Sequence, residues 1–160
     1  MDHESYHDEY IRNILRETKV IAMVGASSNW NRPSYFAMKY LQRKNFRVIP
    51  VNPREVGNKI LTESVYGTLA DVPEKIDMVD IFRNSEAAGA ISDEAIAVGA
   101  KVLWMQLSVR NDSAAARAES AGLKVVMNRC PKIEFARLSR EIGSMGINTG
   151  IISSKRQTII

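Results

Sequence analysis

Five short apolar runs, separated by stretches of helical character, constrain the fold of this chain more than any other feature of its sequence. Each run has the length of one β-strand, and the runs are nearly continuous in Val, Ile, Met and Leu instead of alternating with polar residues. Such runs are typical of strands that are buried on both faces of a parallel sheet. The expected strands are Val20 to Val24, Phe46 to Val51, Met78 to Phe82, Val102 to Leu107 and Val125 to Met127.

The segments between these runs carry helix start and stop signals. Pro33 stands where a first helical turn accepts proline, Ser85 is a capping residue, and Gly122 ends the third segment. This alternation predicts an α/β fold with a doubly wound, mainly parallel five-stranded sheet and helices on both faces, because βαβ crossovers are right-handed. The expected helices are 33–44, 85–98 and 111–121, with an extra one at each end, Tyr6 to Thr18 and Ile133 to Ile142.

The sequence predicts one domain. We expect residues 1–17 to form an amino-terminal helix packed on a domain of residues 18–143, and residues 144–160 to form a loosely ordered tail, because regular periodicity is lost after Gly143. Between Asn58 and Leu69 we expect a loop with a short strand. No internal repeat or low-complexity linker indicates a second domain.

Composition excludes several classes of protein. The chain is 45% hydrophobic and 25% charged, which is typical of a globular domain and not of a disordered or collagen-like one. Its apolar runs are far shorter than the ~20 residues of a membrane helix, so no membrane association is expected. The chain has a single cysteine, Cys130, which cannot form an internal disulfide. One cysteine and two histidines, His3 and His7, are too few for a zinc cluster, so no metal site is expected. These features favour a reducing, cytoplasmic setting.

The positive charge is concentrated in one stretch of the chain. Residues 21–59 carry seven basic side chains against one acidic side chain, Glu55, whereas residues 60–143 hold 10 basic and 12 acidic ones. A phosphate-rich ligand suits such a stretch. Nucleic acid is not the expected partner, because no recognition-helix or RNA-binding motif is present.

The turn after the first expected strand has the composition of a phosphate-binding loop. Four small residues open it: Gly25, Ala26, Ser27 and Ser28. Small side chains expose backbone N–H groups, and the helix that follows contributes the partial positive charge of its amino end. Arg32 could close over a bound phosphate with two parallel hydrogen bonds. An ordinary tight turn with a capping serine is the alternative interpretation.

This loop does not match the nicotinamide dinucleotide fingerprint. The second and third glycines of G-x-G-x-x-G are replaced by Ser27 and Trp30, and no acidic residue ends the second expected strand. NAD is therefore not expected. NADP remains an alternative, because Arg54 could meet a ribose 2′-phosphate. A Walker A loop is excluded by the missing Gly-Lys-Ser/Thr ending.

Several strings taken together and in order resemble a known family. They are Val24-Gly25-Ala26-Ser27, Arg32-Pro33-Ser34, Val48-Ile49-Pro50-Val51-Asn52-Pro53, Val79-Asp80-Ile81-Phe82-Arg83, Trp104-Met105-Gln106-Leu107 and Val125-Val126-Met127-Asn128-Arg129-Cys130. From about Thr18 to Phe135 the chain resembles the small stand-alone CoA-binding domain family, which is similar to the CoA-binding domain of the succinyl-CoA synthetase α-subunit. Two departures are Ser108, where the family has Gly, and Asn128, where it has Asp.

The resemblance implies a Rossmann-like fold, coenzyme A or an acyl-CoA as the cofactor, and a role for each matching segment. Gly25 to Ser28 and Arg32 would surround the pyrophosphate. Val51, Asn52 and Pro53 would lie beside the adenosine, and Phe82 and Arg83 would stand at the next strand end. From the residues alone, Asn52 is equally well a turn residue, Phe82 a core residue, and Arg83 an ion-pair partner of Glu86.

The residues indicate binding and not catalysis. Both histidines precede the expected domain, so neither a phosphohistidine nor a Ser-His-Asp triad is expected, and the chain is not a self-sufficient acyl-CoA ligase. Cys130 is more typical of a buried apolar residue than of a reactive thiol, Asp80 is read as structural, and Gln106 is a candidate contact to the pantetheine amide. We therefore expect a CoA carrier, sensor or regulatory protein. The alternatives are an NADP-dependent oxidoreductase and a regulatory subunit that docks on another protein. The expected partner is a small-molecule CoA ligand, with a homo-oligomer or a protein partner left open.

Overall fold

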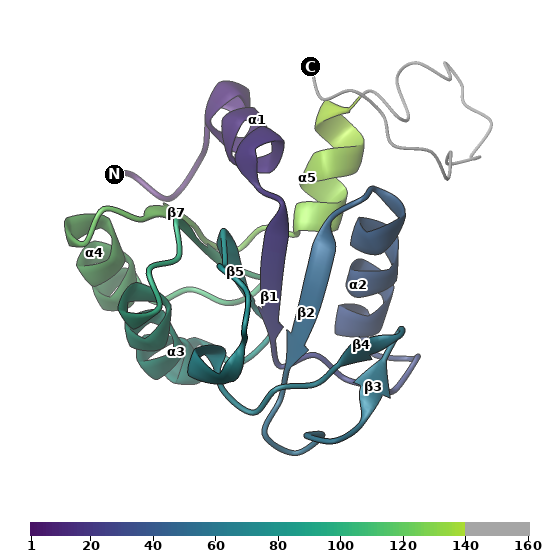
Figure 1. The fold of residues 1–160 in the computed structure, drawn as a ribbon. Helices are drawn as coiled ribbons and strands as arrows, with labels where there is room; N and C mark the ends of the chain where they lie inside the picture. Colours follow the sequence, from purple (N-terminus) through teal and green to yellow (C-terminus); the bar gives the residue numbers. More distant parts are fainter. Residues whose placement is uncertain (140–160) are drawn as a thin grey trace.

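The computed structural model describes residues 1–139, which form a central parallel sheet between two layers of helices (Figure 1). The five strands of this sheet lie in the order β2-β1-β5-β6-β7, and all four neighbouring pairs are parallel. This order confirms the predicted doubly wound, Rossmann-like α/β fold. The strands are β1 (Val20–Val24), β2 (Arg47–Val51), β5 (Met78–Ile81), β6 (Val102–Met105) and β7 (Lys124–Val126).

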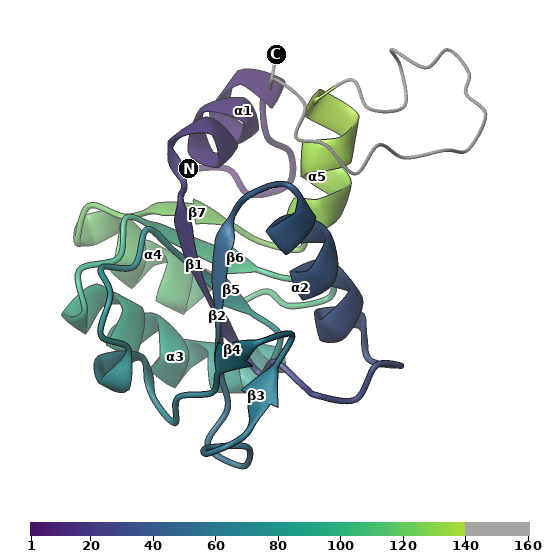
Figure 2. The ribbon, with the colours of Figure 1, turned by 45° about the vertical axis from the view of Figure 1, so that its right-hand side comes forward.

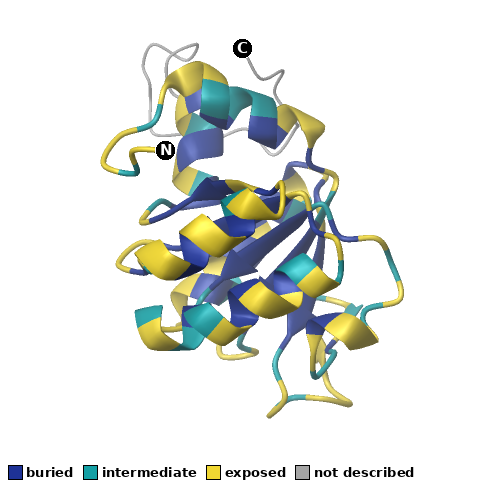
Figure 3. Cartoon of the chain, turned by 90° about the vertical axis from the view of Figure 1, so that its left-hand side faces the viewer, coloured by how far each residue is buried: buried dark blue, intermediate teal, exposed yellow. Residues whose placement is uncertain are grey.

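Helices cover both faces of the sheet, as the turned view in Figure 2 shows. One group packs with the side chains of Ile21, Met23 and Trp104 on one face, and the other packs with Ala22 and Val79 on the opposite face. Both faces are buried, as Figure 3 shows for the strands between the helices, which explains the unbroken apolar runs. The first group is α1 (Asp8–Glu17), α2 (Pro33–Arg43) and α5 (Pro131–Leu138), and the second is α3 (Ser85–Ala97) and α4 (Asp112–Ser120).

Several element boundaries differ from the expected ones by one or two residues, and three of these differences bear on the carboxyl edge of the sheet or on the end of the domain. Strands β5 and β6 end before Phe82 and Gln106, so these two side chains belong to the loops at the carboxyl edge of the sheet. Helix α5 begins two residues earlier than expected, because Pro131 occupies its first turn behind the N-cap residue Cys130. The expected end of that helix at Ile142 and the tail 144–160 lie outside the described residues.

The segment between β2 and β5 contains more structure than the expected loop with one short strand. It forms a two-stranded antiparallel hairpin, β3 (Lys59–Ile60) and β4 (Glu63–Ser64), followed by a 3₁₀ turn, η1 (Leu69–Asp71). A bridge between Val51 and Tyr66 attaches this segment to the end of β2. These strands are too short for their periodicity to be read from sequence.

The strand order reverses between β1 and β5. The chain passes from β1 to its neighbour β2 on one side and then crosses to β5 on the other side of β1. The loops that leave β1 and β5 therefore diverge at the carboxyl edge of the sheet, where open α/β sheets bind their ligands. Within residues 1–139, no helix is long and apolar enough to cross a membrane.

Candidate functional site

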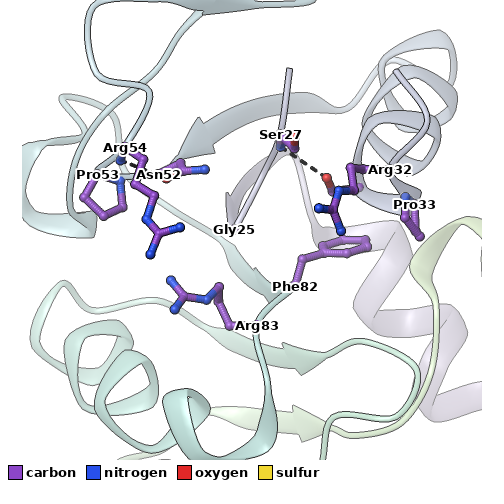
Figure 4. Close-up of a pocket in the computed structure, with 10 residues that line it drawn as sticks. Gly25, Ser27, Arg32, Pro33, Asn52, Pro53, Arg54, Phe82 and Arg83 are labelled. Atoms are coloured by element: carbon purple, nitrogen blue, oxygen red, sulfur yellow. Dashed lines mark hydrogen bonds between the residues drawn. The ribbon is translucent and has the colours of Figure 1, made fainter. Parts of the chain in front are cut away.

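A cleft of about 490 Å³ opens at the carboxyl ends of β1, β2 and β5 (Figure 4). It lies at the point where the strand order reverses, so its walls are the loops that diverge there. Its size is within the range of small-molecule sites. Ten residues line it: Gly25, Ser27, Arg32, Pro33, Ser34, Asn52, Pro53, Arg54, Phe82 and Arg83.

Gly25 is required at the base of the cleft for two reasons. Its φ is +90°, a conformation that residues with a side chain rarely adopt, and a Cβ atom there would lie 2.6 Å from the carbonyl oxygen of Phe82. Its N–H donates to the carbonyl of Val51 at 2.9 Å, which continues the pairing of β1 with β2 past the strand ends. A glycine thus lets the loops after β1 and β5 lie in contact.

The remaining small residues of the loop divide into lining and supporting groups. Ser27 lines the cleft, and its N–H donates to the buried Ser34 hydroxyl at 3.2 Å, in the first turn of α2. Ala26 is buried and Ser28 lies outside the cleft lining, with its N–H directed to the carboxylate of Glu55 at 3.1 Å. Val51 is likewise buried within β2. Ala26, Ser28 and Val51 therefore do not line the cleft, although the sequence placed them at the site.

Three arginines line the cleft without an ion pair to any carboxylate of residues 1–139: Arg32, Arg54 and Arg83. Figure 4 shows the side chains of Arg54 and Arg83 extending toward each other, although their charges repel. The alternative pairing of Arg83 with Glu86 is not formed. Three cations in the lining of one cleft, none of them in an ion pair with a carboxylate of the described residues, create a positive potential that suits an anionic ligand.

Asn52 lines the cleft and also fastens two loops together. Its Nδ2 donates to the carbonyl of Ala26 at 2.9 Å, and its Oδ1 accepts from the N–H of Arg54 at 2.9 Å. Its own N–H donates to the carbonyl of Tyr66 at 2.8 Å. The turn-residue interpretation therefore holds for the side chain of Asn52, whose amide holds the loop after β2 against the loop after β1.

Sequence reasoning left three lining residues out of the predicted site: Pro33, Ser34 and Arg54. A signal was available for Arg54, which lies in the short loop after β2 directly behind Asn52 and Pro53; from the sequence it was considered only as a partner of an NADP 2′-phosphate. Pro33 and Ser34 form the first turn of α2, where helix amino ends commonly meet anions. Their position could have been inferred from the helix start.

The two departures from the family pattern lie together beside this edge. Ser108 and Asn128 both have positive φ, +72° and +57°, and the N–H of Ser108 donates to Oδ1 of Asn128 at 2.8 Å. Asparagine thus supplies the acceptor oxygen that an aspartate would supply, while serine occupies a backbone conformation that favours glycine.

Buried polar groups lie under the same edge of the sheet. Asp80 is fully buried within β5, neither of its carboxylate oxygens has a hydrogen-bond partner, and burial raises the pKa of its carboxyl well above the usual range. Gln106, just beyond β6, is buried with its Oε1 unpartnered. Neither residue lines the cleft, and Cys130 is buried as well. No group of acidic, His or Cys side chains within residues 1–139 is arranged to hold a metal ion.

An open parallel α/β sheet with a cationic cleft at its reversal point defines a Rossmann-like ligand-binding domain. A family model described as a CoA binding domain matches residues 19–136, and the chain therefore belongs to the CoA-binding domain family. The uncharacterized protein YneT of Bacillus subtilis (strain 168) is 32% identical over 126 residues, which cover 79% of this chain and 92% of that protein.

Solved structures show the same fold in chains of similar extent. A hypothetical protein from Pyrococcus horikoshii OT3 is 38% identical, with a TM-score of 0.79 over 86% of this chain and 99% of that one. The structure of cell-free ID.343 from Thermus thermophilus is 32% identical, with a TM-score of 0.79 over 82% of this chain and 98% of that one. The matched region is nearly the whole of both solved chains.

Proposed function

We propose that this protein binds coenzyme A or an acyl-CoA in the cleft at the carboxyl ends of β1, β2 and β5. The observation that carries the proposal is that Arg32, Arg54 and Arg83 line one cleft, and that none of them has a carboxylate partner within residues 1–139. CoA carries a pyrophosphate and a ribose 3′-phosphate, so its recognition requires cations and N–H donors and no acidic clamp. Membership of the CoA-binding domain family supports the same ligand.

The proposal assigns each wall of the cleft a part of the ligand. The pyrophosphate lies against Ser27 and Arg32, at the loop that leads into α2. The adenosine lies beside Asn52 and Pro53. Arg54 belongs to the same wall and binds the ribose 3′-phosphate. Phe82 supplies an apolar surface next to Arg83. The buried residues Ala26 and Val51 support this arrangement from behind the lining, and the exposed Ser28 directly follows Ser27 in the loop assigned to the pyrophosphate.

We propose a holding role, as a carrier, sensor or regulatory protein, because the cleft-lining residues within 1–139 include no nucleophile with an adjacent base. The two histidines of the chain are His3 and His7. The ring of His3 is bonded to the Tyr6 hydroxyl at 2.7 Å and to the Glu119 carboxylate at 3.0 Å, on the β7 side of the sheet. With labelled ATP, succinate and CoA, we expect no acid-labile phosphate on the protein and the same result for a His3→Ala, His7→Ala variant. Label on the wild type that the double variant lacks would contradict the holding role.

An NADP-dependent oxidoreductase is the second candidate, and the observation that favours it is Arg54 in the cleft wall. Thermal unfolding and calorimetry with CoA, acetyl-CoA, 3′-dephospho-CoA, NADP and NAD separate the two. A ligand at 100 times its Kd stabilises the folded state by about 2.7 kcal/mol. We expect CoA and acetyl-CoA to stabilise the protein most and dephospho-CoA less. If NADP stabilises the protein more than CoA does, NADP and not CoA is the ligand.

A further inference from the structure

The carboxylate of Glu55 accepts a hydrogen bond from the backbone of the loop that leaves β1. Its Oε2 accepts a hydrogen bond from the N–H of Ser28 at 3.1 Å. Positions 21–59 contain seven basic residues, and Glu55 is the one acidic residue of this stretch. The one carboxylate of this basic stretch therefore accepts a hydrogen bond from the loop to which the ligand pyrophosphate is assigned.

An ordered turn presents this carboxylate to the loop. The N–H of Glu55 donates to the carbonyl of Asn52 at 3.1 Å, and the carbonyl of Glu55 accepts from the N–H of Asn58 at 3.0 Å. The residue is half-buried, next to Arg54 in the cleft wall. Its backbone is thus fixed, while its side chain ends at an exposed donor.

The loop does not depend on Glu55 for its position. Two other hydrogen bonds join the loops after β1 and β2: the Gly25 N–H donates to the Val51 carbonyl, and the Asn52 amide donates to the Ala26 carbonyl, both at 2.9 Å. These two contacts are neutral and lie deeper, at the strand ends. The Glu55 contact is the charged one and the outermost of the three, so it can open while the loops stay joined.

We propose that Glu55 is the internal counter-anion of the phosphate loop, which a phosphate group of the bound ligand displaces from the Ser28 N–H. This inference rests on the proposed CoA-binding function. A phosphate competes well for the donor because it carries more charge and more acceptor oxygens than a carboxylate. Glu55 thereby sets the affinity of the cleft and favours polyphosphate ligands over weaker anions, which do not displace it.

Neutralising Glu55 separates this role from that of a fixed latch. Glu55→Gln keeps an acceptor oxygen and removes the charge, whereas Glu55→Ala removes both. A displaced counter-anion opposes ligand binding, so both variants bind CoA more tightly, by about three- to tenfold at low salt, as expected for one partly screened charge near a phosphate. A fixed latch supports the loop, so the alanine variant binds CoA more weakly.

Calorimetry with CoA on the full chain tests this, with Glu94→Gln as the matched control. Glu94 is exposed on α3 and is not among the cleft residues, so that variant removes one negative charge away from the site. We expect tighter binding by both Glu55 variants and an affinity of Glu94→Gln within about twofold of wild type. Unchanged or weaker binding by the Glu55 variants overturns the inference while the proposed function stands. Failure of CoA to bind the wild type and every variant overturns both.

The side-chain carboxyl signal of Glu55 gives a second readout that does not depend on variants. In ¹³C spectra of the wild type, saturation with CoA should move this signal to the position of a solvent-exposed carboxylate. A Glu55 signal that CoA leaves in place, while the signals of cleft residues move, overturns the displacement.

Discussion

The cleft and the β7 edge use the same kinds of side chain in opposite ways. In the cleft, Arg32, Arg54 and Arg83 face open space without a carboxylate partner among the described residues. Beside β7, Arg110 is paired with both Glu4 and Asp112, at 2.9 and 2.8 Å. Identical guanidinium groups are therefore without a carboxylate partner among the described residues at one site and are paired within the protein at the other.

Backbone groups follow the same division. On the outer side of β7, the Tyr10 hydroxyl bonds both the N–H and the carbonyl of Val125 at 3.0 Å, and the Tyr6 hydroxyl accepts from the N–H of Met127 at 2.8 Å. The amino-terminal segment thus covers an edge strand that would otherwise be open to pairing with another chain. In the loop after β1, the N–H of Ser28 donates to the carboxylate of Glu55, the contact that we propose a ligand phosphate replaces.

This difference shows that, among the described residues, the fold pairs its polar groups within the protein at the β7 edge and leaves cations unpaired at the cleft. The β7 edge satisfies its polar groups, whereas the cleft holds Gly25 at a φ of +90° and three arginines without a carboxylate partner among the described residues. Binding sites commonly combine such unsatisfied groups with rigid support. Four substitutions test the comparison, beginning with the largest expected effect.

Gly25→Val breaks the base of the cleft. The new side chain meets the Phe82 carbonyl at 2.6 Å and imposes a φ of +90° on a β-branched residue, so we expect a loss of more than about 3 kcal/mol of stability together with the loss of CoA binding. Urea unfolding measures it. Gly57→Val is the control, because its φ is +94° but no atom lies within 4 Å of the added Cβ, and it should lose only about 1 kcal/mol. Equal losses in the two variants would mean that the close contact at Gly25 is unimportant.

Arg32→Ala removes one unpaired cation from the cleft. The loss of a charge-assisted contact to phosphate should weaken CoA by about tenfold or more and leave stability nearly unchanged. Arg117→Ala is the counterpart, because Arg117 is paired with Asp93 at 2.9 Å outside the cleft lining. It should retain CoA affinity and lose at most about 1 kcal/mol. Calorimetry and urea unfolding of both variants check this, and equal CoA affinities would move the phosphate site elsewhere.

Asp80→Asn should stabilise the protein at neutral pH by about 1 kcal/mol or more, because it removes a carboxyl that the folded state must keep protonated. Burial raises the pKa in the folded state, so the wild type loses stability as the pH rises above the unfolded-state pKa of about 3.9. The gain of the variant should therefore shrink as the pH is lowered toward 4. Thermal unfolding between pH 4 and 8 measures it, and a pH-independent difference would contradict the assigned protonation.

Tyr10→Phe tests the β7 edge with the smallest expected effect. It removes the hydroxyl that bonds the N–H and the carbonyl of Val125, which water can partly replace, so we expect a loss of about 1 kcal/mol and no change in CoA affinity. Burial raises the pKa of Tyr10 to about 12, which keeps the hydroxyl protonated across the working pH range. Weaker CoA binding by this variant would show that the two regions are coupled.

Much of the fold could be predicted from the sequence because its signals are local. Five apolar runs gave the five strands of the main sheet, and Pro33 stands at the start of α2. The predicted cap of α3 was one residue too late, because the N-cap is Asn84 and not Ser85: the Asn84 side chain accepts from the N–H of Ala87 at 2.7 Å. The hairpin of β3 and β4 was not predicted, because two-residue strands have no measurable periodicity. The beginning of α5 at Pro131 was misplaced by two residues although the proline signal was present.

For the candidate site, the sequence determined residue types and their order along the chain, and the fold determined which of them meet. The small residues after β1 and the arginine at position 32 could be selected from local pattern, because a phosphate loop is a contiguous segment. Three of the selected residues, Ala26, Ser28 and Val51, lie outside the cleft lining, since the direction of a side chain depends on the packing around it.

Only the tertiary structure decided the pairing of charges. The sequence shows that Arg54 and Glu55 are neighbours, but it does not show that one lines the cleft while the other reaches back to the Ser28 N–H. It also does not show that Arg110 is neutralised by Glu4, more than a hundred residues away. Electrostatic partners are set by distance in space, and that distance is fixed by the crossovers of the sheet, so it has no signature in the order of residues.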